Sequence, residues 1–224
     1  MIITGDTHGT LDLETLRNYC YNFDVRKEYI VILGDVGVCF HNGLKDELVK
    51  KALLDLNSKG ILFIDGNHEN FDLLNSYEIK EWNGGKVHFI DDKIIHLMRG
   101  QVFEIDNKRI FTFGGGNSID KQWRIEGRSW WKEEMPSKEE YEEGLLNLEK
   151  VGNKVDYIFT HTAPREICKR MVQKMYSGEE ELQDYLQRIS ETVDFKKWYY
   201  GHWHFDVDID KKYIGMYNRV KKER

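Results

Sequence analysis

The stretch 1–9, MIITGDTHG, decides the fold, because a short apolar run there leads directly into glycine, aspartate and histidine. Three later segments have the same form. The apolar run 29–33 precedes GD at 34–35, the run 61–65 precedes GNHE at 66–69, and the run 155–160 precedes His161. Such runs are typical of buried strands in an open α/β sheet, whose carboxyl ends share the edge where ligands bind. We therefore expect the polar residues at these strand ends to lie close together.

Around these runs the sequence predicts helices and further strands. Two sets of residues recur at helical spacing and are expected to face the core from crossover helices: Leu11, Thr15, Leu16 and Tyr19, and Leu44, Leu48, Ala52 and Leu56. Strand-like pieces at 87–90, 94–97, 101–105 and 109–113 indicate an antiparallel region, and 198–200, 205–209 and 213–216 also indicate strands. Ser137 and Ser177 each begin an S-x-x-E capping box, before helices expected to end at about residues 150 and 190. We expect one α/β domain over residues 1–220 and a frayed basic tail at 221–224.

Composition and charge limit the partners of the chain. Its 33 Lys+Arg and 39 Asp+Glu residues form no long block of like charge, so nucleic acid is expected only as a substrate, and no protein partner is predicted. Cys20, Cys39 and Cys168 cannot all pair within the chain and lack C-x-x-C spacing, which favours a reducing compartment. The chain reaches Gly5-Asp6 without room for a secretion signal, and no apolar run has the length of a membrane span. We expect a cytoplasmic protein that does not contact a membrane.

The residues that end the predicted strands are of types that bind metal ions. They are Asp6, His8, Asp35, Asn67 and His161, and the later motif GHWH adds His202 and His204. In extended chain, residues i and i+2 point to the same side, so these last two imidazoles would face one site. Each motif alone has an ordinary explanation, such as a helix cap for Asp6, a turn for Asp35 or a core position for His161. Their joint occurrence at strand ends favours a metal site.

The motifs D-x-H, G-D, G-N-H-[D/E], H and G-H-x-H occur in this order between residues 5 and 204. In these motifs the chain resembles the calcineurin-like metallophosphoesterase family. The resemblance implies a four-layer α/β/β/α sandwich of two mixed β-sheets flanked by helices. It also implies two sets of ligands: Asp6, His8 and His204 for a first metal ion, Asn67, His161 and His202 for a second, and Asp35 as a bridge between them. In the family, the histidine at the position of His68 helps to protonate the leaving alkoxide, so His68 is the expected general acid; the alternative is that it only binds a carbonyl group.

The chemistry of the donors leads to the same expectation. Carboxylate, imidazole and amide donors without thiolate suit two divalent transition-metal ions, with Mn as the first choice and Fe, Zn, Co or Ni as alternatives. Two such ions can clamp both sides of an in-line phosphoryl displacement, and a water between them can become the attacking hydroxide near neutral pH. The sequence therefore predicts a binuclear hydrolase of phosphoesters, in which proton donation by a histidine contributes roughly 10²–10⁴ in rate.

The chain departs from the protein serine/threonine phosphatases of the family. These continue the second motif as G-D-x-x-D-R-G, whereas residues 34–40 read GDVGVCF. A partner for His68 and a cation for phosphate must then come from elsewhere. The long stretch 114–136 offers Asn117, Arg124 and Arg128 for substrate binding, since arginine suits phosphate oxygens and a glycine run can form an anion-binding nest. Its tryptophans could stack on a nucleobase, or all these side chains could simply pack the loop in place.

The motifs leave the substrate open. We expect a phosphomonoesterase first, and the alternative is a phosphodiesterase or nuclease acting on nucleotides or nucleic acid, because the same centre serves both and specificity lies in loops. A non-catalytic, protein-binding scaffold of the same fold would be expected to have lost ligands, and none is missing from the motifs. His41, His88 and His96 lie outside the motifs and are interpreted as structural or exposed.

Overall fold

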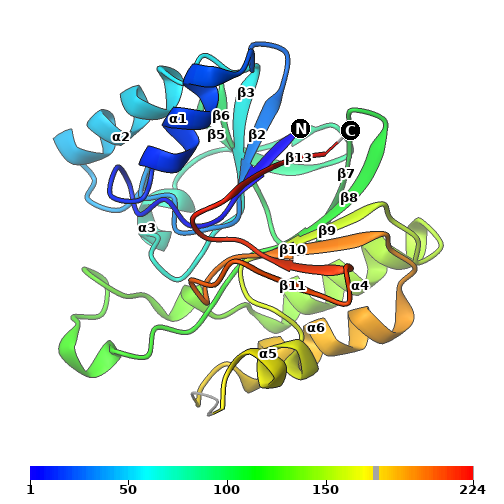
Figure 1. Cartoon of the computed structure of the whole chain (residues 1–224). Coiled ribbons are helices and arrows are strands. Elements are labelled where there is room, and N and C mark those ends of the chain that lie inside the picture. Colours follow the sequence, from blue (N-terminus) through cyan, green and yellow to red (C-terminus); the bar gives the residue numbers. More distant parts are fainter. Residues whose placement is uncertain (174–176, 224) are drawn as a thin grey trace.

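The computed structural model describes residues 1–173 and 177–223, in which two mixed β-sheets pack against each other (Figure 1). The first sheet contains, in spatial order, β13 (Val220–Lys222), β1 (Ile2–Thr4), β2 (Tyr29–Ile32), β3 (Gly60–Phe63), β6 (Ile94–Leu97), β5 (Gly85–Asp91) and β4 (Ile79–Trp82). The second contains β11 (Val207–Ile209), β12 (Tyr213–Gly215), β10 (Lys197–Tyr200), β9 (Tyr157–Thr160), β8 (Lys108–Phe113) and β7 (Gln101–Ile105). The chain crosses from the first sheet to the second between β6 and β7.

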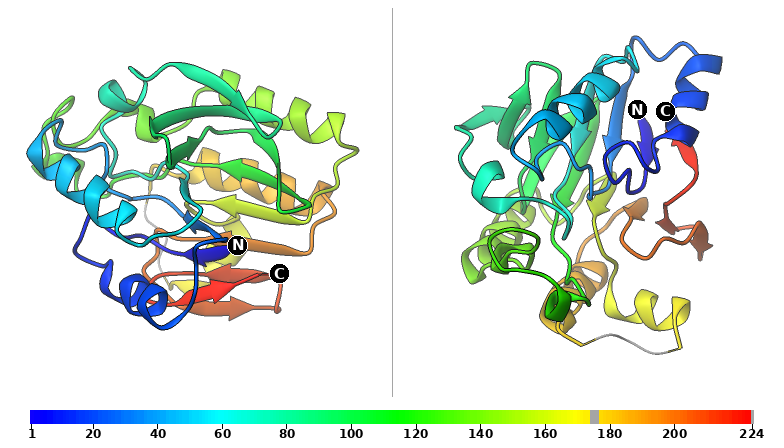
Figure 2. Two further views of the ribbon diagram at one scale, coloured as in Figure 1. Left: turned by 90° about the horizontal axis from the view of Figure 1, so that it is seen from above. Right: turned by 90° about the vertical axis from the view of Figure 1, so that its left-hand side faces the viewer.

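Helices cover the outer face of each sheet (Figures 1 and 2). The first sheet is covered by α1 (Glu14–Asn22), α2 (Leu44–Leu54) and α3 (Phe71–Leu74), and the second by α4 (Lys138–Lys150), α5 (Arg165–Met171) and α6 (Glu180–Thr192). Two short 3-10 helices, Lys121–Trp123 and Lys132–Glu134, interrupt the long loop between β8 and α4. None of the described helices has the length and apolar character that crossing a membrane requires.

Alternating side chains build the layers. In β2, Ile30 and Ile32 pack with the helices of the first sheet, whereas Val31 packs into the core between the sheets. In β10, Trp198 packs with α4 to α6, whereas Tyr199 enters the core between the sheets. Because successive side chains of a strand point to opposite faces, each sheet needs cover on both sides. The chain thus forms the four-layer α/β/β/α sandwich expected from the sequence.

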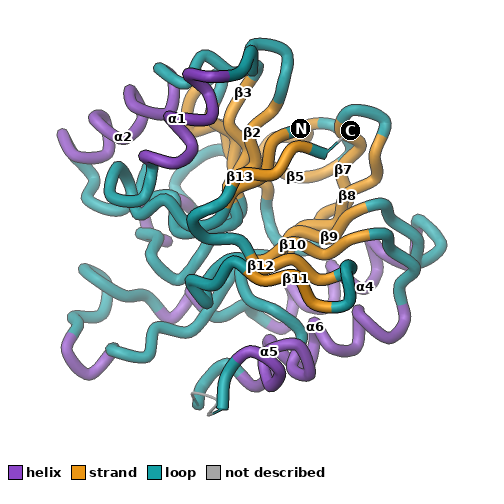
Figure 3. The backbone as a smooth tube through the Cα atoms, viewed as in Figure 1, coloured by secondary structure: helices purple, strands orange, loops and turns teal. Residues whose placement is uncertain are grey.

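Parallel pairing directs the site segments to one place. In the first sheet β1, β2 and β3 run parallel, and in the second β9 and β10 run parallel to each other and to β8 and β12. The loops that follow β1, β2, β3, β9 and β10 contain the predicted ligands, and Figure 3 shows them as loop segments that leave the strands.

The expectation that Leu11, Thr15, Leu44 and Leu48 face the core is wrong. Thr15 is exposed, and the side chains of Leu11, Leu44 and Leu48 are 83%, 76% and 56% exposed, respectively. α1 begins only at Glu14, so Leu11 lies in the preceding loop, and α2 turns Val49 rather than Leu48 into the core. The spacing of the leucines predicts a helix but does not identify its buried face. In α2 a second set of apolar residues, which includes Val49 and Leu53, is also at helical spacing, and this set is buried.

The expectation of a frayed tail is wrong for residues 221–223, while residue 224 lies outside the described residues. β13 pairs antiparallel with β1 as far as Lys222. Glu223 accepts a hydrogen bond from Lys197 Nζ at 2.6 Å and another from the Tyr199 hydroxyl. This pairing satisfies backbone groups at the edge of β1 and brings the two ends of the chain side by side (Figure 2).

Of the two predicted capping boxes, one forms. The Ser137 hydroxyl accepts from the backbone N–H of Glu140, and the Glu140 carboxylate accepts from the backbone N–H of Ser137. The second prediction is wrong, because α6 begins at Glu180 and its N-cap residue is Glu179, which makes no capping bond with its side chain.

Candidate metal centre

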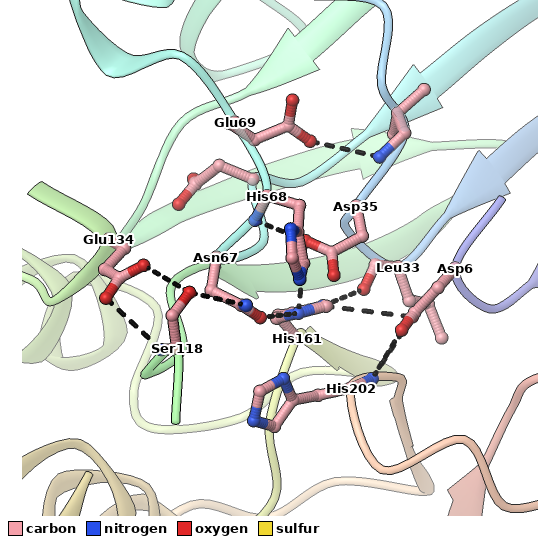
Figure 4. Close-up of polar contacts among 12 residues, drawn as sticks. Asp6, Leu33, Asp35, Asn67, His68, Glu69, Ser118, Glu134, His161 and His202 are labelled. Carbon is pink, nitrogen blue, oxygen red and sulfur yellow. Dashed lines mark hydrogen bonds and ion pairs between the residues drawn. The ribbon is translucent and has the colours of Figure 1, made fainter. Parts of the chain in front are cut away.

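The predicted ligands meet where the carboxyl ends of strands from both sheets lie next to each other (Figure 4). Asp6 and His8 follow β1, Asp35 follows β2, Asn67 follows β3, His161 follows β9, and His202 and His204 follow β10. Short parallel strands therefore bring together residues that are far apart in the sequence.

Asp6 lies at the centre of one group of candidate ligands. The Nε2 atom of His204 is 3.1 Å from Asp6 Oδ2, and the backbone N–H of His202 donates to both Asp6 oxygens at 3.1 and 3.2 Å. One ligand atom each of Asp6, His8 and His204 lie within 4.8 Å of one another. A single cation could contact all three.

Asp35 lies between this group and a second one. Its Oδ2 atom is 3.5 Å from His8 Nε2, and its Oδ1 atom is 3.6 Å from His161 Nε2. Ligand atoms of Asp6, Asp35 and His161 also lie within 4.8 Å of one another, and the Asn67 amide oxygen is 3.1 Å from His161 Nε2. The Asp35 carboxylate therefore faces imidazoles on both sides.

At the Asp35 carboxylate, the effect of the neighbouring imidazoles on the pKa outweighs that of burial. Burial raises the pKa of Asp35, but the adjacent imidazoles, first that of His161, hold the pKa of this carboxyl well below its usual range. Burial lowers the pKa of His8, but hydrogen bonds and charge from Asp35 and Asp12 raise it to about 9. A buried carboxylate needs a positive partner. Protonated imidazoles provide that charge, and a metal ion competes with protons for the same nitrogen atoms.

The donor set fits divalent transition-metal ions. It consists of carboxylate oxygens, imidazole nitrogens and one amide oxygen, the combination preferred by borderline divalent ions. Two overlapping groups of donors share Asp6, and Asp35 contacts a histidine of each. The residues present therefore suit two adjacent ions.

The backbone at several predicted ligands is strained. The φ angles of His8, Asp35, His202 and His204 are 42°, 50°, 65° and 52°, in the left-handed region that few non-glycine residues adopt. Such residues cluster at functional sites, where the surrounding structure holds the strain. The extended conformation expected for the GHWH motif is thus wrong. β10 ends at Tyr200, and the two imidazoles reach the cluster from a tightly turned loop.

A carboxylate that the sequence does not predict holds His202. The Nε2 atom of His202 is 3.3 Å from Glu179 Oε1, and buried Glu179 also accepts from Thr162 Oγ1 at 2.9 Å and Gln183 Nε2 at 2.7 Å. Burial lowers the pKa of His202, but Glu179 raises it to about 9. His202 lies outside both described groups of three donors, although its ring centroid is 4.9 Å from that of His161. In the sequence, Glu179 lies in the run SGEEE. No feature of this run distinguishes Glu179 from the glutamates next to it, which would be expected to face solvent.

A second unpredicted carboxylate, Glu134, orients the Asn67 amide (Figure 4). The Ser118 hydroxyl donates to Glu134 Oε2 at 2.7 Å and accepts from Asn67 Nδ2 at 3.0 Å. A hydroxyl has a single proton, so one that donates to a carboxylate can only accept from the amide. The amide oxygen of Asn67 therefore faces His161, as a metal ligand would require.

His68 lies beside the candidate ligands and outside both described groups of three. Its backbone N–H donates to Asp35 Oδ1 at 2.7 Å, and its ring meets that of His8 edge-on with centroids 5.8 Å apart. The guanidinium of Arg124 lies along the ring, with Nη1 3.1 Å from His68 Nδ1 and Nη2 3.3 Å from His68 Nε2. Burial and then Arg124 lower the pKa of His68, against an opposing effect of Asp35.

The three residues predicted to bind substrate lie in different surroundings. Arg124 reaches His68 and lines a cavity of about 490 Å³ together with His202 and His204. Asn117 lines the same cavity, but its side chain donates to Ser177 O and accepts from Lys121 Nζ, so it supports the loop. Arg128 is exposed and is not among the described residues that line this cavity. Of the histidines outside the motifs, His41 is exposed, and His88 and His96 are buried.

A scan against protein-family models gives no match to this chain, and a search of curated proteins gives none either. The functional interpretation therefore rests on the candidate ligands, His68 and their surroundings.

Proposed function

We propose that this chain is a metal-dependent phosphoesterase of the calcineurin-like type that hydrolyses phosphomonoesters. The observation that carries the proposal is the pair of overlapping donor groups, in which Asp6 is shared and Asp35 contacts both His8 and His161. Neither group can be assembled from neighbouring residues in the sequence. Their meeting at one edge of two sheets is the arrangement that a binuclear centre needs.

Each ion would have its own donors. Asp6, His8 and His204 would hold one ion, Asn67, His161 and His202 would hold the other, and Asp35 would contact both. Mn²⁺ is the first choice, and Fe, Zn, Co or Ni suit the same donors. When bound, such ions stabilise negative charge on phosphoryl oxygens and lower the pKa of a water molecule.

The proton for the leaving alcohol would come from His68. Its lowered pKa weakens the hold of the ring on a proton, so a protonated His68 can transfer that proton readily to an alkoxide. Arg124, whose guanidinium lies against the same ring, offers N–H donors for phosphate oxygens. Arg124 would thus take the place of the arginine in the D-R-G segment that is missing after Asp35.

A panel of substrates tests the proposal. Protein loaded in turn with Mn²⁺, Fe²⁺, Zn²⁺, Co²⁺ or Ni²⁺ is assayed with p-nitrophenyl phosphate, its bis ester, a cyclic nucleotide and a phosphopeptide. We expect turnover of a monoester with Mn²⁺, its loss in Asp35→Asn, and its retention in Asp92→Asn, a matched change at an exposed position. Preference for the bis ester or the cyclic nucleotide would instead favour a phosphodiesterase or nuclease. Bound ions without turnover of any substrate would contradict the proposal and favour a scaffold.

We also propose that the protein acts in the cytoplasm. Cys20, Cys39 and Cys168 are free, and the last two are buried. Unpaired thiols suit a reducing compartment, which supports a protein that acts in the cytoplasm. The redox state of the three cysteines in protein isolated from its native cells tests this, and any disulfide found there would count against it.

A further inference from the structure

An apolar pocket opens directly beside the candidate metal centre. Its volume is about 450 Å³, within the range of small-molecule sites. Leu11, Phe40, Leu48 and Val49 provide apolar walls, and His8, Asp35 and His68 also line it. We call this cavity the Leu48 pocket.

Several apolar side chains near the pocket are exposed to solvent, although the sequence predicts that they are buried in the core. Leu48 is 56% exposed and Leu44, one helical turn earlier, is 76% exposed, while Leu11 approaches from the β1 to α1 loop at 83% exposure. These are the leucines that the sequence assigns to the core. Exposed apolar side chains that gather in one place mark sites of binding. Here Leu11 and Leu48 line a cavity that also contains His8, Asp35 and His68, whereas Leu44 is not among the described residues that line it.

The pocket is formed by segments that are held in place. The backbone N–H of His8 donates to Asp35 O at 2.8 Å, and that of Gly9 donates to Val36 O at 2.9 Å. A Cβ atom at Gly9 would lie 3.2 Å from the Val49 side chain, so this loop packs closely on α2. The backbone hydrogen bonds connect the loop after β1 to the loop after β2. The contact between Gly9 and Val49 connects the loop after β1 to α2. The cavity therefore exists before any ligand arrives.

Two cavities with different chemistry meet at His68. The cavity that contains Arg124, Asn117 and Glu179 offers hydrogen bonds and charge, whereas the Leu48 pocket offers mainly carbon surface, and Asp35 and His68 line both. In the Leu48 pocket a phosphoryl group would exchange its hydration for walls that are mainly carbon, with Lys45 and His41 as further polar lining, whereas the other cavity offers Arg124 and several hydrogen-bonding side chains. The phosphoryl group therefore belongs on the polar side, and the remainder of the ester belongs in the Leu48 pocket.

We propose that the Leu48 pocket binds the alcohol portion of the substrate, and that the preferred substrates are phosphomonoesters of compact apolar alcohols. This inference rests on the proposed function. Hydrolysis breaks the P–O bond to the alcohol, forms a P–O bond to the oxygen of water, and leaves an alkoxide that takes its proton from His68, which lines this pocket. Apolar alcohols gain from leaving water here, whereas polyhydroxy alcohols lose hydrogen bonds.

Two esters of primary alcohols test the preference without a large difference in leaving-group reactivity. The Mn²⁺-loaded protein is assayed with 3-phenylpropyl phosphate and glycerol 1-phosphate, and we expect kcat/KM for the first to be higher by at least about tenfold. Leu48→Ser and Leu11→Ser should each lower this ratio by several-fold. Leu146→Ser, on α4, should leave the ratio unchanged, because Leu146 is also 56% exposed but is not among the described residues lining either cavity.

A binding experiment separates this inference from the proposed function. Titration calorimetry with 3-phenylpropylphosphonate, which cannot be hydrolysed at its P–C bond, should show tighter binding than methylphosphonate and a negative heat-capacity change. Both effects should be lost in the Leu48→Ser, Leu11→Ser double variant and kept in Leu146→Ser. Preferential binding without turnover of any ester would overturn the proposed function but support the pocket. Equal kcat/KM values together with equal binding of the two phosphonates would overturn the pocket and leave the hydrolase standing.

Discussion

Glycines in the sequence motifs make room for candidate ligands that follow other strands. A Cβ atom at Gly34 would lie 2.2 Å from the Nδ1 atom of His161, and one at Gly66 would lie 2.1 Å from Asp35 Oδ1. One at Gly201 would lie 2.2 Å from an Asp6 oxygen. The motif glycines are therefore required because the ligands pack against their backbones.

Gly66→Ala should disrupt the candidate metal centre. The new methyl group must displace the Asp35 carboxylate, and overpacking of this kind costs about 1–3 kcal/mol of unfolding free energy. We expect lower thermal stability and at least roughly tenfold weaker Mn²⁺ binding by titration calorimetry. Gly43→Ala is the control, because the nearest atom to its added Cβ lies 4.0 Å away. Wild-type Mn²⁺ affinity in Gly66→Ala would show that Asp35 does not need its observed position.

His68→Ala should separate catalysis from metal binding. Because His68 lies outside both described donor groups, we expect unchanged metal content by elemental analysis and a loss in kcat of about 10²–10⁴. The loss should be larger for an alkyl phosphate than for p-nitrophenyl phosphate, whose leaving group needs little protonation. Unchanged rates on both esters would remove His68 from the mechanism.

At the scale of elements, the two serines that begin S-x-x-E motifs offer a matched comparison. Ser137 caps α4 with a reciprocal pair of hydrogen bonds, whereas Ser177 lies outside α6, whose N-cap is Glu179. Ser137→Ala should lower the unfolding free energy by about 1 kcal/mol, measured by urea denaturation. Ser177→Ala should change it by less than about 0.5 kcal/mol. Equal losses in the two variants would contradict the assignment of the caps.

The helix α2 shows how tertiary contacts select a face. Apolar residues cover more than one side of this helix. Its packing in the core of the first sheet, where it contacts β3, buries Val49 and Leu53, while Leu44 and Leu48 remain exposed. The periodicity of the sequence predicts a helix here but cannot tell which face of the helix is buried, because the apolar residues of each face recur at helical spacing. In the structure, Leu48 from the exposed face and Val49 from the buried face both line the Leu48 pocket.

At the scale of the whole molecule, a buried polar network joins the layers. Arg99, in the segment that crosses between the sheets, donates from Nε and Nη2 to Asp65 Oδ2 at 2.8 and 2.6 Å and from Nη1 to Glu140 on α4 at 3.2 Å. Asp65 also contacts His96, which in turn contacts His88 at 3.1 Å. The network extends from the first sheet to the helices of the second.

This network predicts a loss of stability at acidic pH. Burial, followed by the neighbouring His96, lowers the pKa of His88 to about 4. A histidine with a depressed pKa in the folded state contributes stability above its unfolded pKa, and this contribution is lost as the pH falls through about 6.5 toward 4. Between pH 7 and pH 5 His88 alone should contribute a loss of roughly 2 kcal/mol. This loss opposes a gain from His8 and His202, whose pKa values of about 9 favour the folded state as the pH falls.

Urea denaturation of the metal-free wild type and of His88→Gln at both pH values isolates this contribution. When the pH falls from 7 to 5, the unfolding free energy of His88→Gln should change more favourably than that of the wild type, by roughly 2 kcal/mol. His41→Gln, at an exposed histidine, should behave like the wild type. An identical pH dependence in His88→Gln would show that His88 does not contribute to it.

Local patterns in the sequence were enough to predict buried strands of an α/β fold and the candidate ligands near their ends, whereas the four layers were implied only by the family resemblance of the motifs. Short apolar runs that end in Gly-Asp or Gly-Asn-His specify both a buried strand and a polar residue at its end, and parallel pairing then brings these ends together. The meeting of Asp6 with Asp35 follows from the parallel pairing of β1 and β2. His161 follows β9 in the second sheet and joins them only because the two sheets pack against each other.

Only the tertiary structure decided which residues surround those ligands. Glu134 and Glu179 act on Asn67 and His202 from segments whose sequence is that of an ordinary charged surface, and Arg124 reaches His68 from a long loop. Tertiary contacts also determine which face of α2 is buried and that β13 pairs with β1. Periodicity and local propensity report on a residue and its near neighbours in the chain, whereas burial and pairing depend on surfaces that meet only when the two sheets and their helices pack.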